Sequence, residues 1–202
     1  MPILVIGTTN RKKGKELETL LAQTGWEIRT LLDYPNAIEP EENGQSFAEN
    51  ARLKASQQAK HLGVTVLADD SGLCVDALQG APGIYSARFA GEPTDNAANN
   101  ALLLEKLQNV SIAERTAAFV CTMAVAGADG SILAETKGVC HGRIRESLDG
   151  TGGFGYDPLF EIVEYHETFG QLSAVVKAIL SHRAAAARQM LPLLQNLKRQ
   201  MN

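Results

Sequence analysis

Two adjacent acidic residues, Asp69 and Asp70, follow the apolar run 64–68 (VTVLA). Such a run is typical of a strand buried on both faces, and α/β sheets bind their ligands where strands of this kind end. Neighbouring carboxylates at the edge of a core repel each other unless a cation neutralises them, and Mg²⁺ prefers a few carboxylates together with water and phosphate oxygens. We therefore expect a metal site here, although a turn or capping role for the sequence DDSG explains the same residues.

A second acidic pair, Glu41 and Glu42, lies in the acidic, proline-containing stretch 33–45. We expect this stretch to approach the same metal. A solvated loop explains the two residues equally well, and the sequence does not decide which of them would be the ligand.

The polar turn at residues 8–13 (TTNRKK) follows the apolar run 3–7. It opens a predicted helix, and the first N–H groups of a helix bind anions. Its three cations oppose the helix dipole, an unfavourable arrangement that a bound polyphosphate would relieve. The turn therefore predicts a phosphate site, with a solvated helix start as the alternative, but it lacks the spacing of a Walker A loop. The candidate residues are Thr8, Thr9, Asn10, Arg11, Lys12 and Lys13.

Two further groups suit a nucleobase. The glycine-rich stretch 150–157 (GTGGFGYD) offers two aromatic rings that can cover a flat ligand, and Lys177 with residues 181–183 (SHR) offers hydrogen-bond donors. Each group also has a structural explanation, namely aromatic rings fixed in the core and a histidine that makes ordinary structural hydrogen bonds. Taken together with a phosphate site and a metal site, they describe a nucleotide-binding site.

The elements that must position these residues are those of an α/β protein. Strands are predicted at 3–7, near 27–32 and at 64–68, and helices at 11–24, 47–62, 94–109 and from 181 onward with a kink at Pro192. A capping box at 46–49 marks the start of the second helix. Residues 116–127 and 131–140 flank an Asp-Gly step, which predicts a hairpin. We expect one domain, residues 1–202, with two lobes, the second at roughly 115–165, and one cleft that collects the site.

Composition excludes several classes of protein. The net charge of −4 argues against a general nucleic-acid-binding surface, which needs a positive field. The three cysteines are widely spaced and form no CxxC pair, so we expect reduced, mostly buried thiols. The apolar run at the N-terminus is too short for a signal peptide or a membrane span, and we expect a cytoplasmic protein.

The sequence resembles the inosine triphosphate pyrophosphatase family, which hydrolyses non-standard purine nucleotides. The resemblance covers essentially the whole chain and several long motifs in the same order. These are TTNRKK at 8–13, SFAENARLKA at 46–55, ADDSGLCVDAL at 68–78, APGIYSAR at 81–88, GTGGFGYDP at 150–158 and SHR at 181–183. One departure is Thr9, where the family usually has glycine.

The resemblance implies a fold and a set of roles. The fold is an elongated, two-lobed α/β structure with a mixed sheet, flanking helices and a central cleft, usually assembled as a homodimer. Asp70 would be the proton acceptor and a Mg²⁺ ligand, with Asp69 beside it and Glu42 the favoured ligand over Glu41. The triphosphate would contact Thr8, Thr9, Asn10, Lys13, Lys54 and Ser71. The base and sugar would contact Phe154, Gly155, Tyr156 and Asp157, and the base edge would be read by Lys177, His182 and Arg183.

The reaction implied is attack of water at the α-phosphorus of dITP, ITP or XTP, which releases a nucleoside monophosphate and pyrophosphate and cleanses the nucleotide pool. Two alternatives stay open. One is a nucleotide-binding regulatory module without hydrolysis, and the other is a pyrophosphatase for modified pyrimidine nucleotides. From the net charge and the short apolar N-terminal run we expect no nucleic-acid or membrane partner.

Overall fold

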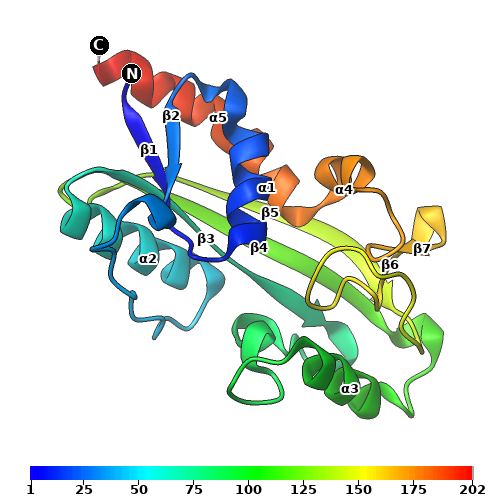
Figure 1. The fold of residues 1–202 in the computed structure, drawn as a ribbon. Coiled ribbons are helices and arrows are strands. Elements are labelled where there is room, and N and C mark those ends of the chain that lie inside the picture. The colour runs from blue at the N-terminus through cyan, green and yellow to red at the C-terminus, as the bar shows by residue number, and fades with distance from the viewer. Residues whose placement is uncertain (202) are drawn as a thin grey trace. The chain divides into compact units, whose positions relative to one another are not determined.

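The computed structural model describes residues 1–201, which form a sheet of seven strands with helices packed against it (Figure 1). The strands are β1 (Ile3–Ile6), β2 (Glu27–Thr30), β3 (Thr65–Val75), β4 (Thr116–Ala126), β5 (Ile132–Ile144), β6 (Phe160–Ile162) and β7 (Glu167–Thr168). The α-helices are α1 (Arg11–Leu21), α2 (Phe47–Leu62), α3 (Asn96–Leu107), α4 (Ala174–Leu180) and α5 (His182–Met201). The strand order is β2-β1-β3-β4-β5-β6-β7, with parallel pairs at β1 and antiparallel pairs at β6. The predicted α/β class with a mixed sheet is confirmed.

The chain divides into two compact units. The first consists of Met1–Asp70, Cys121–Gly138 and His182–Asn202, and the second of Ser71–Val120 and Val139–Ser181. Strands β3, β4 and β5 each contribute residues to both units. This division groups residues by their internal contacts and does not test the prediction of one domain with a second lobe at 115–165, which stays a prediction.

In the first unit, helices cover both faces of the sheet. One apolar cluster joins α1 and α5 to Leu67 of β3 and Met123 of β4, and a second joins α2 to Val66 and Ala124 of the same two strands. Successive residues on a strand point to opposite faces, so each strand supplies both clusters by alternation. Within the first unit, residues 65–70 of β3 therefore face α1 and α5 when their number is odd and α2 when it is even.

The second unit has its own core around three phenylalanine rings. The rings of Phe119 and Phe160 lie 4.6 Å apart between centroids, and those of Phe160 and Phe169 lie 5.2 Å apart. Leu103 and Leu107 of α3 join this cluster. The core anchors β6 and the loop that precedes it, which contains residues 150–157.

Most predicted elements are confirmed. The helix α2 begins after the N-cap Ser46 and ends before the left-handed residue Gly63, as its sequence signals predict. The hairpin of β4 and β5 turns through Gly130, which has a φ of 84°. The helix α5 continues through Pro192 to Met201.

The predicted end of β3 is wrong. We expected the strand to stop at residue 68 and to deliver Asp69 and Asp70 into a loop, but β3 continues through both residues to Val75. Residues 72–75 (GLCV) are small or apolar, and Leu73 and Val75 are buried in the core of the second unit. Burial of that second apolar half outweighs the turn tendency of the polar residues in the middle.

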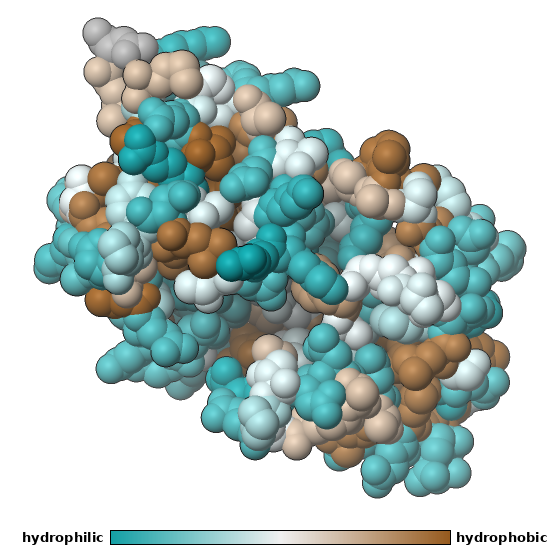
Figure 2. All heavy atoms as spheres, in the orientation of Figure 1, coloured by the Kyte–Doolittle hydropathy of each residue, from teal (hydrophilic) through white to brown (hydrophobic). Residues whose placement is uncertain are grey.

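The surface and the cysteines agree with the composition. On the face drawn in Figure 2, hydrophilic residues cover most of the surface and hydrophobic residues form small separate groups. Cys121 and Cys140 are buried and Cys74 is half-buried, and none of the three forms a disulfide within residues 1–201. Among residues 1–201, none of the helices is long and apolar enough to cross a membrane.

Candidate active site

Asp69 and Asp70 occupy opposite faces of β3, because they are consecutive residues of one strand. Asp69 faces α1 and α5, and Asp70 faces α2. Both are buried, with exposed fractions of 4% and 7%. The two carboxylates therefore point to opposite faces, and each forms ion pairs with different cations, Lys13 and Arg183 at Asp69 and Lys54 at Asp70.

The Asp70 carboxylate is held at both oxygens by residues of α2. Lys54 Nζ lies 2.8 Å from Oδ1, and Asn50 Nδ2 donates a hydrogen bond of 3.2 Å to Oδ2. Burial raises the pKa of the Asp70 carboxyl above its ordinary value, and the Lys54 ammonium opposes that increase. Asp70 is thus a buried carboxylate of increased basicity beside a fixed cation.

Lys54 connects Asp70 to the predicted acidic loop. Its ammonium nitrogen lies 3.6 Å from Glu42 Oε1 as well as 2.8 Å from Asp70 Oδ1. Burial alone lowers the pKa of Lys54, but the carboxylates of Asp70, Asp69 and Glu42 together raise it above its ordinary value. One half-buried cation therefore already bridges the two carboxylates that we predicted to share a metal.

The two residues of the acidic pair differ in position. Glu42 contacts Lys54, whereas the Glu41 carboxylate accepts a hydrogen bond from Asn43 Nδ2 and its backbone N–H donates to Gln57 Oε1, both at 3.3 Å. Of the pair, Glu42 is the one brought to Asp70.

This arrangement fits a divalent cation. No group of three histidine, cysteine or acidic side chains that would hold a metal occurs within residues 1–201. Mg²⁺, however, is commonly bound by one or two carboxylates that leave positions for water and phosphate oxygens. Asp70 and Glu42 supply two carboxylates that already share a cation, so the donor set fits Mg²⁺ with a phosphate-bearing ligand.

Asp69 belongs to a buried ion network on the other face of β3. The Arg183 guanidinium, 2% exposed, lies 3.4 Å from the Asp69 carboxylate and 2.8 Å from Glu16 Oε2. Lys13 Nζ lies 3.7 Å from the same Asp69 oxygen. Burial lowers the pKa of Arg183, but Asp69 and Glu16 together hold it above its ordinary value. Sequence reasoning missed Glu16, whose signal was its spacing of three residues from Lys13 on α1.

The polar turn 8–13 is organised by Asn10. Its Oδ1 accepts hydrogen bonds from Lys12 N–H at 3.0 Å and Lys13 N–H at 3.2 Å, so the side chain occupies two of the N–H groups that we expected to face phosphate. Arg11 and Lys12 are exposed, and Lys13 is half-buried. Thr9 is not among the positive-φ residues of the described chain, so its backbone does not require the glycine usual in the family.

In the second unit, Asp157 organises the glycine-rich loop. Its Oδ2 accepts a 2.7 Å hydrogen bond from Phe154 N–H and pairs with the Lys177 ammonium. A Cβ on Gly153 would lie 1.9 Å from the same oxygen, and Gly153 has a φ of 75°, so only glycine fits there. Lys177 also lies over the Phe154 ring, 5.2 Å from its centroid.

The two predicted aromatic residues have different surroundings. Tyr156 is buried in the core of the second unit, where its hydroxyl donates to the Ser86 carbonyl at 2.8 Å. Phe154 is half-buried. Tyr156 is therefore fixed in the core, and Phe154 is the ring that stays partly exposed.

The predicted donor cluster is divided between the units. Lys177 belongs to the second unit and contacts Asp157, whereas the buried residues His182 and Arg183 belong to the first. Ser71, the first residue of the second unit, is half-buried and continues β3 after Asp70.

Comparison with known proteins identifies the family. A relative from Rhodopirellula baltica, named dITP/XTP pyrophosphatase, is 48% identical over 194 residues, which cover 96% of this chain and 93% of the relative. One of the same name from an Exiguobacterium species is 51% identical over 93% of this chain and 94% of its own. The solved structure of the Staphylococcus aureus Ham1 protein is 38% identical, covers 96% of this chain and 99% of its own, and superposes with a TM-score of 0.86. The model of the Ham1 family matches residues 4–193. The predicted resemblance is thus confirmed, and the chain belongs to the Ham1 family.

Proposed function

We propose that this chain hydrolyses the non-standard purine nucleotides dITP, ITP and XTP to the nucleoside monophosphate and pyrophosphate, and so removes them from the nucleotide pool. The proposal is supported by two relatives of nearly the same length, 48% and 51% identical, that are named dITP/XTP pyrophosphatase. The structural observation that carries it is Asp70, a buried carboxylate fixed by Lys54 and Asn50 and connected through Lys54 to Glu42.

Asp70 is assigned the role of general base. It accepts a proton from a water molecule whose oxygen attacks the α-phosphorus, and the bond between that phosphorus and the bridging oxygen to the β-phosphorus breaks to release pyrophosphate. A carboxyl whose pKa is raised by burial is a stronger proton acceptor than an ordinary aspartate. Asp69, bound in its own ion network, supports the site by holding Lys13.

The triphosphate is assigned to the turn that follows β1 and to residues of α1, α2 and β3. The cations Lys13 and Lys54 neutralise phosphate charge, and Lys54 exchanges part of its contact with Asp70 and Glu42 for the phosphate oxygens. Hydroxyl, amide and cationic groups complete the contacts. They are Thr8, Thr9, Asn10, Arg11, Lys12 and Ser71.

A magnesium ion is assigned to Asp70 and Glu42, with Glu41 as the alternative ligand. When bound, Mg²⁺ neutralises charge on the triphosphate and on the pyrophosphate that leaves. The support from this chain is the Lys54 ammonium, which lies 2.8 Å from the Asp70 carboxylate and 3.6 Å from that of Glu42.

The purine is assigned to two groups of residues. Phe154, Gly155, Tyr156 and Asp157 form the loop that encloses the base and sugar, with the ring of Phe154 as the stacking surface. Lys177, His182 and Arg183 are the donors to the base edge. Hypoxanthine and xanthine carry an O6 acceptor, whereas adenine has an amino group there that would leave a buried donor unpaired. This should lower kcat/KM for ATP relative to ITP by up to about 10⁴–10⁵-fold.

A substrate panel with product identification tests the proposal. Purified protein with Mg²⁺ should convert ITP, dITP and XTP to monophosphates and pyrophosphate, separated by ion-exchange chromatography, and should use ATP and GTP far more slowly. Asp70→Asn should lower kcat by roughly 10²–10⁴-fold, because a general base is lost. Release of orthophosphate, or equal use of ATP and GTP, would contradict the proposal.

The same panel separates the two alternatives. Tight binding of ITP without turnover would favour a regulatory module. Faster hydrolysis of methylated pyrimidine triphosphates than of ITP would favour a pyrophosphatase for modified pyrimidines.

We further propose that the protein acts in the cytoplasm as a homodimer, without nucleic-acid or membrane partners. The three cysteines form no disulfide within residues 1–201, which supports a reducing compartment. The homodimer rests on the family resemblance, and sedimentation of the purified chain tests it.

A further inference from the structure

Asn50 lies in the first turns of α2 and is 2% exposed. Both ends of its side-chain amide are engaged. Nδ2 donates to Asp70 Oδ2 at 3.2 Å, and Oδ1 accepts from Gly44 N–H at 2.9 Å. One buried amide thus joins the carboxylate of β3 to the backbone of the acidic loop.

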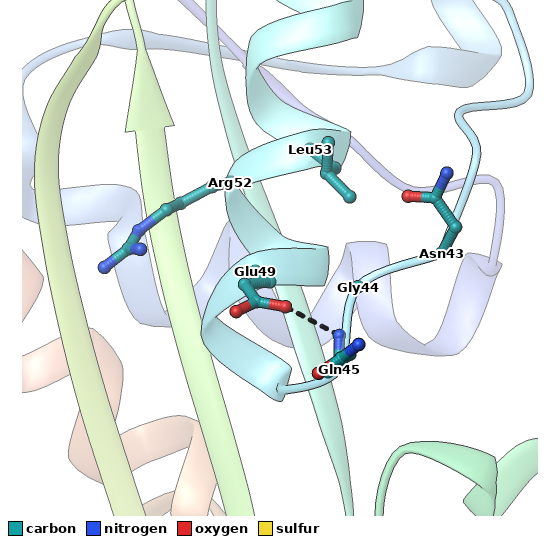
Figure 3. A pocket seen from close by; sticks show the side chains of 6 residues that line it. All are labelled: Asn43, Gly44, Gln45, Glu49, Arg52 and Leu53. Atoms are coloured by element: carbon teal, nitrogen blue, oxygen red, sulfur yellow. Dashed lines mark hydrogen bonds between the residues drawn. The ribbon is translucent and has the colours of Figure 1, made fainter.

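The loop is packed closely against Asn50 at this point. A Cβ added to Gly44 would lie 2.7 Å from Asn50 Oδ1 and 2.7 Å from Glu49 Cβ, so the glycine permits the approach. The next residue is fixed too, because Gln45 N–H donates to Glu49 Oε2 at 2.6 Å, the contact drawn in Figure 3. In the same view Arg52 extends away from the loop, consistent with its pairing to Glu135 of β5.

These contacts form a closed series that includes both proposed metal ligands, Asp70 and Glu42. Asn50 connects Asp70 to Gly44, Gly44 lies two residues from Glu42 in the chain, and Lys54 connects Glu42 back to Asp70. Lys54 is one helical turn beyond Asn50, so both grip the carboxylate from the same face of α2. The Asp70 orientation and the Glu42 loop are therefore set by the same buried residue.

We infer that Asn50 is a positioning residue for catalysis, which holds Asp70 and the Glu42 loop in the relative arrangement that the proposed metal and water require. The inference rests on the proposed function for the roles of Asp70 and Glu42. An amide suits this task because one end must donate and the other must accept. Aspartate would lose the donor to Asp70 and place a like charge against it, and alanine would lose both contacts.

The test compares substitutions at Asn50 with a matched control in the same helix. Gln58 is also fully buried in α2 and also ties the preceding loop to the helix, through hydrogen bonds with both the carbonyl and the N–H of Ile38, but none of its contacts given by the structure is with a carboxylate. Asn50→Ala, Asn50→Asp, Gly44→Ala and Gln58→Ala are made in the full chain, and kcat and KM for ITP are measured separately with Mg²⁺.

We expect Asn50→Ala and Asn50→Asp to lower kcat by roughly 10- to 100-fold, the usual effect of losing a residue that orients a metal ligand, while KM for ITP changes less than about threefold. Gly44→Ala should also lower kcat, because it displaces the loop that carries Glu42 and leaves the donor to Asp70 in place. Gln58→Ala should keep kcat within about threefold of the unsubstituted protein. As a second readout, electron paramagnetic resonance should show Mn²⁺ binding weakened roughly tenfold by Asn50→Ala in the presence of an uncleavable α,β-methylene analogue of dITP.

The outcomes separate the inference from the proposed function. If the unsubstituted protein releases pyrophosphate from ITP but Asn50→Ala and Gln58→Ala have equal effects on kcat and on Mn²⁺ binding, the inference fails and the function stands. If the unsubstituted protein does not cleave ITP, the proposed function fails, and the Mn²⁺ comparison still decides whether Asn50 organises the cation site. If Asn50→Ala does not fold, the kcat values of the isosteric Asn50→Asp variant and of Gly44→Ala test the inference instead. Values equal to that of Gln58→Ala would overturn it.

Discussion

At the residue scale, the adjacent carboxylates Asp69 and Asp70 differ because a strand alternates its side chains between two faces. Asp69 pairs with Arg183, which is 2% exposed, and with Lys13. Asp70 pairs with Lys54 and accepts from Asn50. The Asp69 carboxylate neutralises a buried guanidinium. Burial disfavours the ionised form of Asp70 and so raises the pKa of that carboxyl.

This difference predicts opposite effects on stability and activity. Asp69→Asn should lower the free energy of unfolding by about 2–4 kcal/mol, because it leaves the buried Arg183 charge incompletely compensated. Asp70→Asn should change that free energy by less than about 1 kcal/mol, because the amide keeps an acceptor for Asn50 and removes a buried charge. Urea unfolding of both variants measures the two values, and an equal loss in both would contradict the separation of the two faces.

At the element scale, the close approach of α5 to β5 fixes the position of the first turn of α5, which carries His182 and Arg183. A Cβ on Gly138 of β5 would lie 2.0 Å from the His182 carbonyl oxygen and 2.4 Å from Ala186 N. Thr136, two residues earlier, donates to the Ala186 carbonyl at 3.1 Å. The strand and the first turns of the helix therefore touch through their backbones.

Gly138→Ala should push α5 away from β5. Backbone atoms cannot yield as a flexible side chain can, so we expect a loss of about 1–3 kcal/mol or more in the free energy of unfolding. The control is Gly14→Ala in α1, where a Cβ would lie 3.7 Å from Thr30 Cγ2, an ordinary contact. That variant should gain about 0.5–1 kcal/mol, because alanine favours the helix. Thermal and urea unfolding measure both, and a neutral Gly138→Ala would contradict the close packing.

At the scale of the whole molecule, each unit has its own apolar core, and three strands contribute residues to both units. The second unit also buries a charge. Glu161 of β6, 1% exposed, pairs with Arg143 at 2.6 Å and with Arg145 at 3.3 Å. The hydrogen bond from Arg143 lowers the pKa of Glu161 below its ordinary value, and Arg145 contributes to the decrease.

The lowered pKa predicts how stability depends on pH. The folded chain favours ionised Glu161, so the stabilisation is complete above the ordinary glutamate pKa of 4.5 and is lost as pH falls through the lower folded value. Glu161→Gln should lower the free energy of unfolding by about 1–3 kcal/mol at pH 7. Urea unfolding between pH 7 and pH 3 should show the difference from the unsubstituted protein shrinking in the acid range. A difference that is constant over this range would assign the effect to packing.

The sequence by itself determined the α/β class, most helices and strands, and the residue types of the candidate site. Local signals were sufficient for these, as with Ser46 and Gly63 at the two ends of α2. The family followed from long motifs in order. The sequence also predicted Lys54 and Glu42 as site residues, and in the structure Lys54 contacts both Asp70 and Glu42.

Only the tertiary structure decided that Asp69 and Asp70 lie on opposite faces of β3 with different partners. The sequence showed two adjacent acids but not that β3 continues through them, because that continuation depends on burial of Leu73 and Val75 in a core assembled from distant segments. Once both acids lie within the strand, alternation sends Asp69 to Arg183 and Asp70 to Asn50. Partners from α1, α2 and α5 then give the two carboxylates different charges to balance, and no local pattern around residues 69 and 70 contains that information.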